Sequence, residues 1–283
     1  MLAALGATVA WGVNYTVAKR VLQEIDPLAV AAVRALTGLV VFGAVLLLLD
    51  GPSGLAWPRL RRALPLGLLG IFANQILFIE GLKRTSPAHS SILVALLPVY
   101  VLVLSVSAGQ ERASSRKILG VGVALAGVVV VAAEKGLSLA SGTLAGDLLT
   151  IGAGLSFAGY TVAGRPLLRE LGPLRATALS FVGGGAGILA VALPRSLHQP
   201  WRSPSPAALW GLAYVALVST VLAYLLYYFA VDRLDPSKVA VFTYLQPLLA
   251  AAVAYFAAGD RVTGHLVVGG ALILLGVVLA ERG

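Results

Sequence analysis

The sequence contains no cysteine, which excludes disulfide bonds, thiolate metal sites and a cysteine nucleophile. Charge is scarce as well. Asp, Glu, Lys and Arg make up only 12% of the chain, whereas about 25% is usual in a soluble domain. So few charged groups cannot solvate the surface of a 283-residue soluble protein. These two absences favour a membrane protein over a soluble or disulfide-rich one.

Motifs that would indicate an enzyme are missing too. The three histidines are scattered and show no HExxH-like spacing. No Walker A pattern occurs, and no glycine run has the spacing of a dinucleotide-binding loop. We therefore expect no catalytic residue, no metal and no cofactor. An intramembrane enzyme is disfavoured, and any transport would have to use an ion gradient or facilitated diffusion.

Apolar residues dominate what is present. They make up 59% of the chain, with a mean hydropathy of +0.92. They come in long runs, and about 20 mostly apolar residues are enough for a helix to cross a bilayer. The runs predict an all-α membrane protein with ten transmembrane helices. The expected spans are roughly 2–20, 27–49, 63–82, 88–108, 117–134, 144–165, 173–193, 207–231, 237–258 and 263–280.

The net charge of +9 would suggest nucleic acid as a partner of a soluble protein. Here the basic residues stand between apolar runs, as anchors and orientation signals, and form no contiguous basic face. We expect a lipid bilayer as the partner and no nucleic acid. With the N-terminus inside, the inner loops hold more Lys and Arg than the outer ones. This bias predicts both termini in the cytoplasm, in a plasma membrane such as the bacterial inner membrane.

The sequence also repeats itself. A shift of 149 places three prolines or glycines of the first half on identical residues of the second: Pro87 on Pro236, Gly120 on Gly269, and Gly127 on Gly276. The halves, 1–136 and 137–283, then hold five spans each. Because five is odd, the second half enters the membrane in the opposite sense. Such inverted repeats are common in secondary transporters, with the substrate near the midplane where the repeats meet, and favour alternating access.

Pro98 and Pro247 also coincide at this shift, near the centres of spans four and nine. A central proline removes a backbone hydrogen bond and kinks the helix. We expect the pair to act as symmetric hinges beside a cavity. The alternative is that proline is simply more frequent in membrane helices.

At these residues the chain resembles the drug/metabolite transporter superfamily, of the EamA type. The resemblance covers nearly the whole chain, and the order, spacing and duplication of its short motifs make it specific. It implies a ten-helix transporter with a central cavity, usually an exporter of amino acids or other small metabolites. Two positions depart from the pattern, with Gln246 where relatives often have a carboxylate and Tyr228 where they often have Asn. The matching segments are Ala10–Asn14, Ala32–Arg34, Thr85–Ala88, Leu97–Val99, Gly109–Arg112, Gly146–Leu149 and Gly259–Arg261.

Polar groups inside the hydrocarbon are costly and indicate function. We expect amides to hydrogen-bond the polar end of a substrate and aromatic rings to enclose its apolar part. The tyrosines have an alternative role in interfacial belts or helix packing, and the asparagines one in interhelical hydrogen bonds. The candidate lining residues are Trp11, Asn14, Tyr15, Asn74, Gln75, Phe78, Tyr160, Tyr224, Tyr228, Tyr244 and Gln246.

Three charged or titratable residues complete the candidates. Arg34 lies about two turns inside span two, where it would bind either a substrate carboxylate or backbone carbonyls at a helix end. His89 opens span four and is expected to titrate near neutral pH or to line the cavity mouth. Glu80 has two readings, a local ion pair with Lys83 or Arg84 and a proton-coupling carboxylate.

The favoured function is secondary transport that exports a small-molecule metabolite, with an amphipathic or aromatic amino acid as the expected substrate. A non-transporting membrane scaffold or receptor is the alternative. The glycine-rich faces of spans five, seven and ten would serve either packing within the chain or a homodimer.

Overall fold

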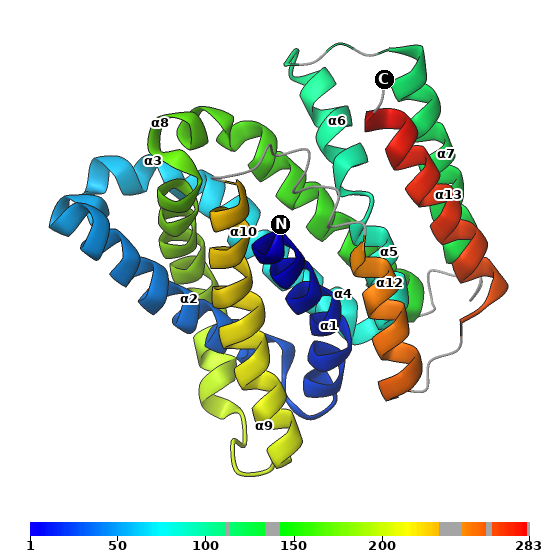
Figure 1. The fold of residues 1–283 in the computed structure, drawn as a ribbon. Helices are drawn as coiled ribbons and strands as arrows, with labels where there is room; N and C mark the ends of the chain where they lie inside the picture. The colour runs from blue at the N-terminus through cyan, green and yellow to red at the C-terminus, as the bar shows by residue number, and fades with distance from the viewer. Residues whose placement is uncertain (111, 113, 134–141, 232–244, 259–261, 282–283) are drawn as a thin grey trace.

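The computed structural model describes every residue except 111, 113, 134–141, 232–244, 259–261, 282 and 283. Within that part of the chain every regular element is helical. The helices form a single bundle in which segments distant in sequence lie side by side (Figure 1). The all-α fold class is therefore confirmed.

In the first half, two membrane segments depart from regular α-helical geometry. α3, η2 and α4 form one continuous helix with a π-helical middle, and α5 is separated from α6 by a turn at Ala95 and Leu96. The bounds are α1 Leu2–Glu24, α2 Pro27–Asp50, η1 Gly51–Leu55, α3 Trp57–Gly67, η2 Leu68–Ala73, α4 Asn74–Arg84, α5 Pro87–Val94, α6 Leu97–Ser107 and α7 Ser115–Ala133.

In the second half, α8 is a bent helix. Its backbone leaves the helical region at Gly172, where φ is 77°, a value that favours glycine. α9, η3 and α10 again form a continuous helix with a π-helical middle. The bounds are α8 Gly142–His198, α9 Pro206–Ala213, η3 Tyr214–Leu222, α10 Ala223–Val231, α12 Leu245–Val253, η4 Ala254–Ala258 and α13 Gly264–Glu281.

Helix starts follow local chemistry. The side chains of Asp26 and Ser86 accept hydrogen bonds from the first turns of α2 and α5, and a proline occupies the first helical position of each. Ser205 caps α9 in the same way. A capping oxygen satisfies a free N–H, and proline has none to satisfy there. The helix starts at Pro27 and Pro87 agree with the expected spans 27–49 and 88–108.

Among the described residues, five helices are long and apolar enough to cross a membrane. The count of ten spans stays a prediction. The five are Pro27–Leu55, Trp57–Arg84, Pro87–Ser107, Thr143–His198 and Pro206–Tyr227, and two shorter apolar helices cover Leu245–Ala257 and Gly264–Gly276.

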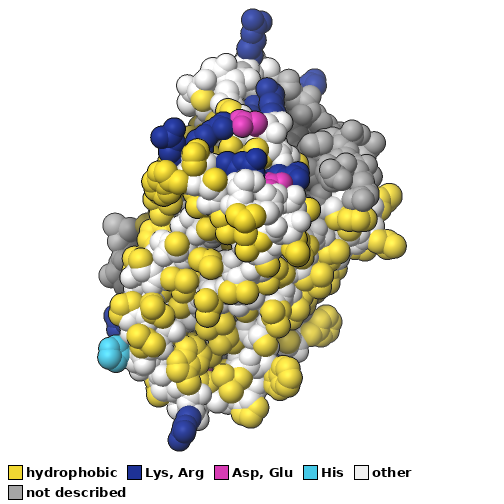
Figure 2. Space-filling view, turned by 90° about the vertical axis from the view of Figure 1, so that its left-hand side faces the viewer, with side chains coloured by type: hydrophobic (Ala, Val, Ile, Leu, Met, Phe, Trp, Pro, Cys, Tyr) yellow, Lys and Arg dark blue, Asp and Glu magenta, His cyan; other side chains and the backbone are white. Residues whose placement is uncertain are grey.

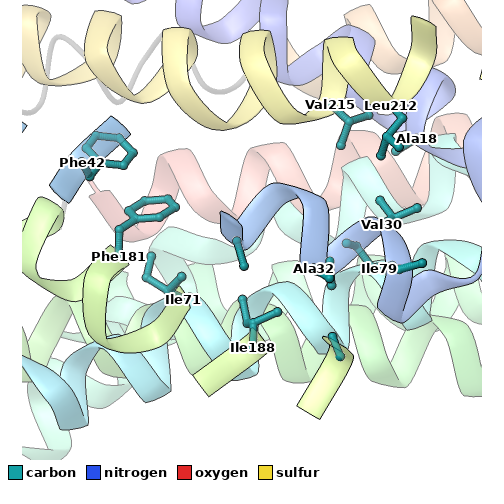
Figure 3. Close-up of a cluster of buried hydrophobic side chains, with 14 of the residues drawn as sticks. Ala18, Val30, Ala32, Phe42, Ile71, Ile79, Phe181, Ile188, Leu212 and Val215 are labelled. Atoms are coloured by element: carbon teal, nitrogen blue, oxygen red, sulfur yellow. The ribbon is translucent and has the colours of Figure 1, made fainter. Parts of the chain in front are cut away.

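The main core lies where α1, α2, α4, α8 and α9 meet (Figure 3). Phe42 of α2 stacks on Phe181 of α8 at a centroid distance of 4.5 Å, and both are fully buried. Glycines allow the backbones to approach closely. A Cβ on Gly184 of α8 would lie 2.3 Å from the carbonyl oxygen of Gly67 on α3. This close packing is how membrane helices gain van der Waals contact in lipid.

The outside of the bundle is apolar. Leu48 and Phe256 are each 85% exposed and Trp210 is 79% exposed. Figure 2 shows hydrophobic side chains over most of one face, with Lys and Arg gathered at its upper end. At the Gly172 bend, arginines pair with acids, Arg62 with Glu170 and Arg175 with Asp50. An apolar band with charged ends fits a bilayer, whereas soluble proteins rarely expose such large apolar areas.

Candidate functional site

Arg34 is a buried cation between α2 and η3. It is 6% exposed, and its Nε donates to the Thr220 hydroxyl over 3.0 Å. That hydroxyl donates in turn to the carbonyl of Val215, five residues earlier, inside the π-helical stretch. Nη1 of Arg34 is buried with no hydrogen-bond partner among the described residues. The guanidinium is therefore positioned at one nitrogen and unsatisfied at another.

A group of aromatic rings lies on one side of this cation. Tyr224 of α10 interacts electrostatically with Arg34 and touches Phe181 edge-on at 5.0 Å. Trp11 of α1 lies 5.4 Å from Tyr224 and 5.5 Å from Tyr227. The Trp11 indole N–H donates to the Ser219 carbonyl over 3.0 Å, which anchors α1 to the π-helical stretch η3. The structure thus brings Arg34, Trp11 and Tyr224 together.

Tyr160 joins the same cluster from α8. Its hydroxyl is 3.1 Å from the Thr177 hydroxyl and lies beside Ser180, the residue that precedes Phe181. The cluster is therefore built from α1, α2, α8 and α10, which belong to both halves of the sequence.

The predicted amides divide into two kinds. Asn74 donates through Nδ2 to the carbonyl of Ala153 on α8 over 2.9 Å, the interhelical bond that was its alternative role. Gln75 is 2% exposed, and neither of its amide atoms has a hydrogen-bond partner in the described part of the chain. Oδ1 of the buried Asn14 also has none there. Unsatisfied buried polar atoms are costly, so Gln75 and Asn14 are the amides that a bound polar group would satisfy.

The remaining candidates are placed less centrally. Tyr15 is buried and meets Phe78 edge-on at 5.6 Å, between α1 and α4. Gln246 is buried on α12, and its carbonyl faces Gly12 of α1. Tyr244 lies outside the described residues, as do the side chains of Tyr228 and Pro98. The hinge role of Pro98 and Pro247 stays a prediction, although α5 ends in a turn just before Pro98.

His89 has a different environment. Its Nδ1 is 3.3 Å from Oδ2 of Asp147 on α8, and both side chains are buried. The Thr85 hydroxyl donates to the other oxygen of the same carboxylate. Glu80 instead forms an i,i+4 ion pair with Arg84, which supports the local ion-pair reading.

No functional role was predicted for Thr220 or Asp147 from the sequence. Thr220 carried no signal, because hydroxyl residues are common in membrane helices and the partner Arg34 is 186 residues away. Asp147 did carry one, since an acidic residue inside an apolar run is rare and usually functional.

A shallow hollow on the bundle surface lies elsewhere. Its lining residues are all of apolar type and include none of the predicted polar residues, which suits contact with lipid chains. It is lined by Leu2, Ala3, Leu225, Leu226 and Phe229.

Long apolar helices around a buried polar and aromatic cluster define an integral membrane protein with polar side chains in its interior, a pattern that indicates function in such proteins. Comparison with known sequences identifies the family. The chain belongs to the EamA-like transporter family, whose model matches residues 1–133 and 144–281. The family resemblance expected from the motifs is therefore confirmed.

Individual relatives agree with this. An uncharacterized transporter of Archaeoglobus fulgidus is 30% identical over 273 residues, which cover 95% of this chain and 92% of the relative. A probable terminal-alkyne amino-acid exporter of Streptantibioticus cattleyicolor is 28% identical over 252 residues, covering 88% and 83%. A protein of known crystal structure, 23% identical, superposes with a TM-score of 0.68 over 99% of this chain and 96% of its own, and so shares the fold. The relatives are named as transporters, which points away from an enzyme.

Proposed function

We propose that this transporter exports small metabolites that carry a carboxylate, amino acids above all, by alternating access. The proposal depends on the environment of Arg34. This residue is buried, forms no ion pair with a described carboxylate, and keeps Nη1 without a partner in that part of the chain. A cation in the membrane interior is costly unless it is paired. A substrate carboxylate would supply the missing anion and accept from the guanidinium fork.

The surroundings of Arg34 support an amphipathic substrate. Tyr224, Trp11 and Phe181 offer ring faces and edges for an apolar side chain. Gln75 lies on α4, which packs against α2, and its unsatisfied amide offers donors and acceptors. An amino acid combines these needs in one small molecule. The relative named as a probable amino-acid exporter supports the same substrate class.

The mechanism follows from two inverted halves, 1–136 and 137–283. The π-helical stretches support this division into halves. When η2 is shifted by 149 residues it corresponds to 217–222, which lies inside η3. α7 and α13 also meet reciprocally, since Gly127 packs on Gly269 and its counterpart Gly276 packs on Gly120. Such reciprocity is a property of two-fold related contacts. Exchange of conformation between the halves would open the cluster to each side in turn.

The location is proposed from charge. Arginines gather at the end of the bundle that holds the Gly172 bend, where Arg59, Arg62 and Arg175 pair with acids. With that end in the cytoplasm, both termini are cytoplasmic and the membrane is the plasma membrane.

The test is uptake into proteoliposomes of radiolabelled amino acids alongside the same compounds with the carboxylate converted to an amide. Saturable uptake of the acids alone, lost in Arg34→Gln and kept in Arg202→Gln, is the expected result. Arg202 is a suitable control because it is exposed in the loop before α9. Equal uptake of acids and amides, or retention of uptake in Arg34→Gln, would show that Arg34 does not read a carboxylate.

A third outcome bears on the function itself. If no compound moves above empty liposomes while the protein stays monodisperse and folded, the amino-acid proposal is wrong. A non-transporting scaffold or receptor role would then gain weight.

A further inference from the structure

The buried pair His89–Asp147 lies apart from the aromatic cluster and has no part in the binding site described above. The His89 ring is 3% exposed and the Asp147 carboxyl 5%. Nδ1 of His89 is 3.3 Å from one carboxylate oxygen, and Thr85 donates to the other. An imidazole and a carboxyl group, each able to bind a proton, are thus held together out of water.

The pair connects the two halves of the chain. His89 and Thr85 belong to the first half, at the start of α5 and the end of α4, and Asp147 belongs to the second, near the start of α8. The backbones touch here as well. A Cβ on Gly146 would lie 2.7 Å from the Thr85 nitrogen and 2.8 Å from the Gly81 carbonyl oxygen. Opening the bundle at this end requires these contacts to part.

Among the residues that the structure describes, the other charged groups around the pair are already engaged. Lys19 of α1 donates to the carbonyls of Leu82, Lys83 and Thr85, and so caps the end of α4. Glu80 and Arg84 of α4 pair with each other. The remaining neighbours of α5 are α12 and α13. α12 contains no titratable residue, and His265 of α13 is exposed.

We propose that His89 and Asp147 form a proton-binding site that latches the two halves together and couples export to a proton gradient. Uptake of a proton by the neutral ring converts its hydrogen bond with the carboxylate into an ion pair. In a low-dielectric interior, an ion pair between the charged ring and the carboxylate is stronger than the hydrogen bond between the neutral ring and the same carboxylate. The end of the bundle therefore closes when protonated and is free to open when the proton leaves to the other side. Only an N–H bond is made and broken in each cycle.

The proposal rests on the proposed export function, and transport tests the coupling. If one proton is exchanged per substrate molecule, a difference of about one pH unit across the membrane supports a substrate concentration ratio of about ten. We expect this gradient-driven accumulation in wild type and in His265→Gln. In Asp147→Asn and His89→Gln it should disappear, while exchange of labelled for unlabelled substrate at equal pH persists. Accumulation that remains driven by pH in both variants would overturn the coupling, and so would a wild type that ignores the gradient.

A second measurement needs neither a substrate nor transport. The chain has only three histidines, so the ring signals of isotope-labelled histidine can be assigned by NMR of the detergent-solubilised protein through His89→Gln and His265→Gln. We expect the His89 signal to titrate in wild type and its titration to be displaced in Asp147→Asn, with His198 and His265 unchanged. A His89 signal that ignores pH, or one that ignores Asp147, would refute the proton site even if export is established. Titration as expected without any export would instead place the failure in the proposed function.

Discussion

Gly276 of α13 lies against the backbone of Gly120 on α7, so closely that a Cβ on Gly276 would be 2.5 Å from the Gly120 carbonyl oxygen. The same Cβ would be 2.4 Å from the Ala124 nitrogen. Figure 1 shows the two helices side by side at one edge of the bundle. These glycines serve packing within the chain, and a homodimer stays a prediction.

Gly276→Ala should therefore destabilise the protein. The added methyl meets backbone on both sides, which cannot rotate away, and overpacking of this kind costs about 1–3 kcal/mol. Gly122→Ala on α7 is the matched control, since a Cβ there meets nothing within 4 Å. It should be neutral or stabilising by about 0.5–1 kcal/mol, because alanine favours helix over glycine. Thermal unfolding in detergent measures both, and equal melting temperatures would show that α7 and α13 do not pack this closely.

Thr220→Val should weaken substrate binding through Arg34. The substitution removes the hydroxyl that accepts from Nε of Arg34 while it keeps the shape of the side chain. A misaligned guanidinium loses bidentate geometry, so we expect KM to rise, by about tenfold for a loss of about 1.4 kcal/mol. Arg34→Lys should raise KM similarly, because an ammonium cannot bind a carboxylate as a planar fork. An unchanged KM in both variants would indicate that Arg34 does not touch the substrate.

The neighbours Asn74 and Gln75 should respond differently to substitution. Asn74→Ala removes a bond to the Ala153 carbonyl and should cost about 0.6–1.7 kcal/mol of stability, with KM unchanged in the folded protein. Gln75→Leu removes atoms that have no partner in the described structure, so it should leave stability unchanged or raise it. If Gln75 binds substrate, this variant raises KM. Thermal unfolding together with uptake kinetics separates the two, and loss of stability in Gln75→Leu would contradict the assignment.

Glu24 should make stability depend on pH. It lies at the end of α1, outside the expected span 2–20. The backbone N–H and the hydroxyl of Ser205 donate to it over 2.6 and 2.8 Å. The bonds hold the pKa of the Glu24 carboxyl below its ordinary value of 4.5. Because the folded-state pKa is the lower one, the contact stabilises above the ordinary pKa and is lost as pH falls through the folded value. Wild type should melt above Glu24→Gln near neutral pH, and the difference should vanish in acid. A difference that stays constant with pH would rule this out.

Much of the fold could be read from the sequence because lipid imposes a simple rule. Backbone polar groups in hydrocarbon must be satisfied within the segment, so long apolar runs become helices. The helix boundaries at Pro27, Pro87 and Pro173 followed from local chemistry as well, since caps and prolines act within one turn. The π-helical stretches in η2 and η3 could not be read, because no residue type marks them.

By itself, the sequence determined the membrane class, the helical fold, the family and the set of intramembrane polar residues, since each of these depends on composition and local order. Only the tertiary structure decided how those residues are used. It separated Asn74, which bonds to Ala153, from its neighbour Gln75, which has no such bond. It set Arg34 on Thr220 and His89 on Asp147, across 186 and 58 residues of chain. A buried charge takes its role from the partner it meets in space, and nothing local in the sequence specifies that partner.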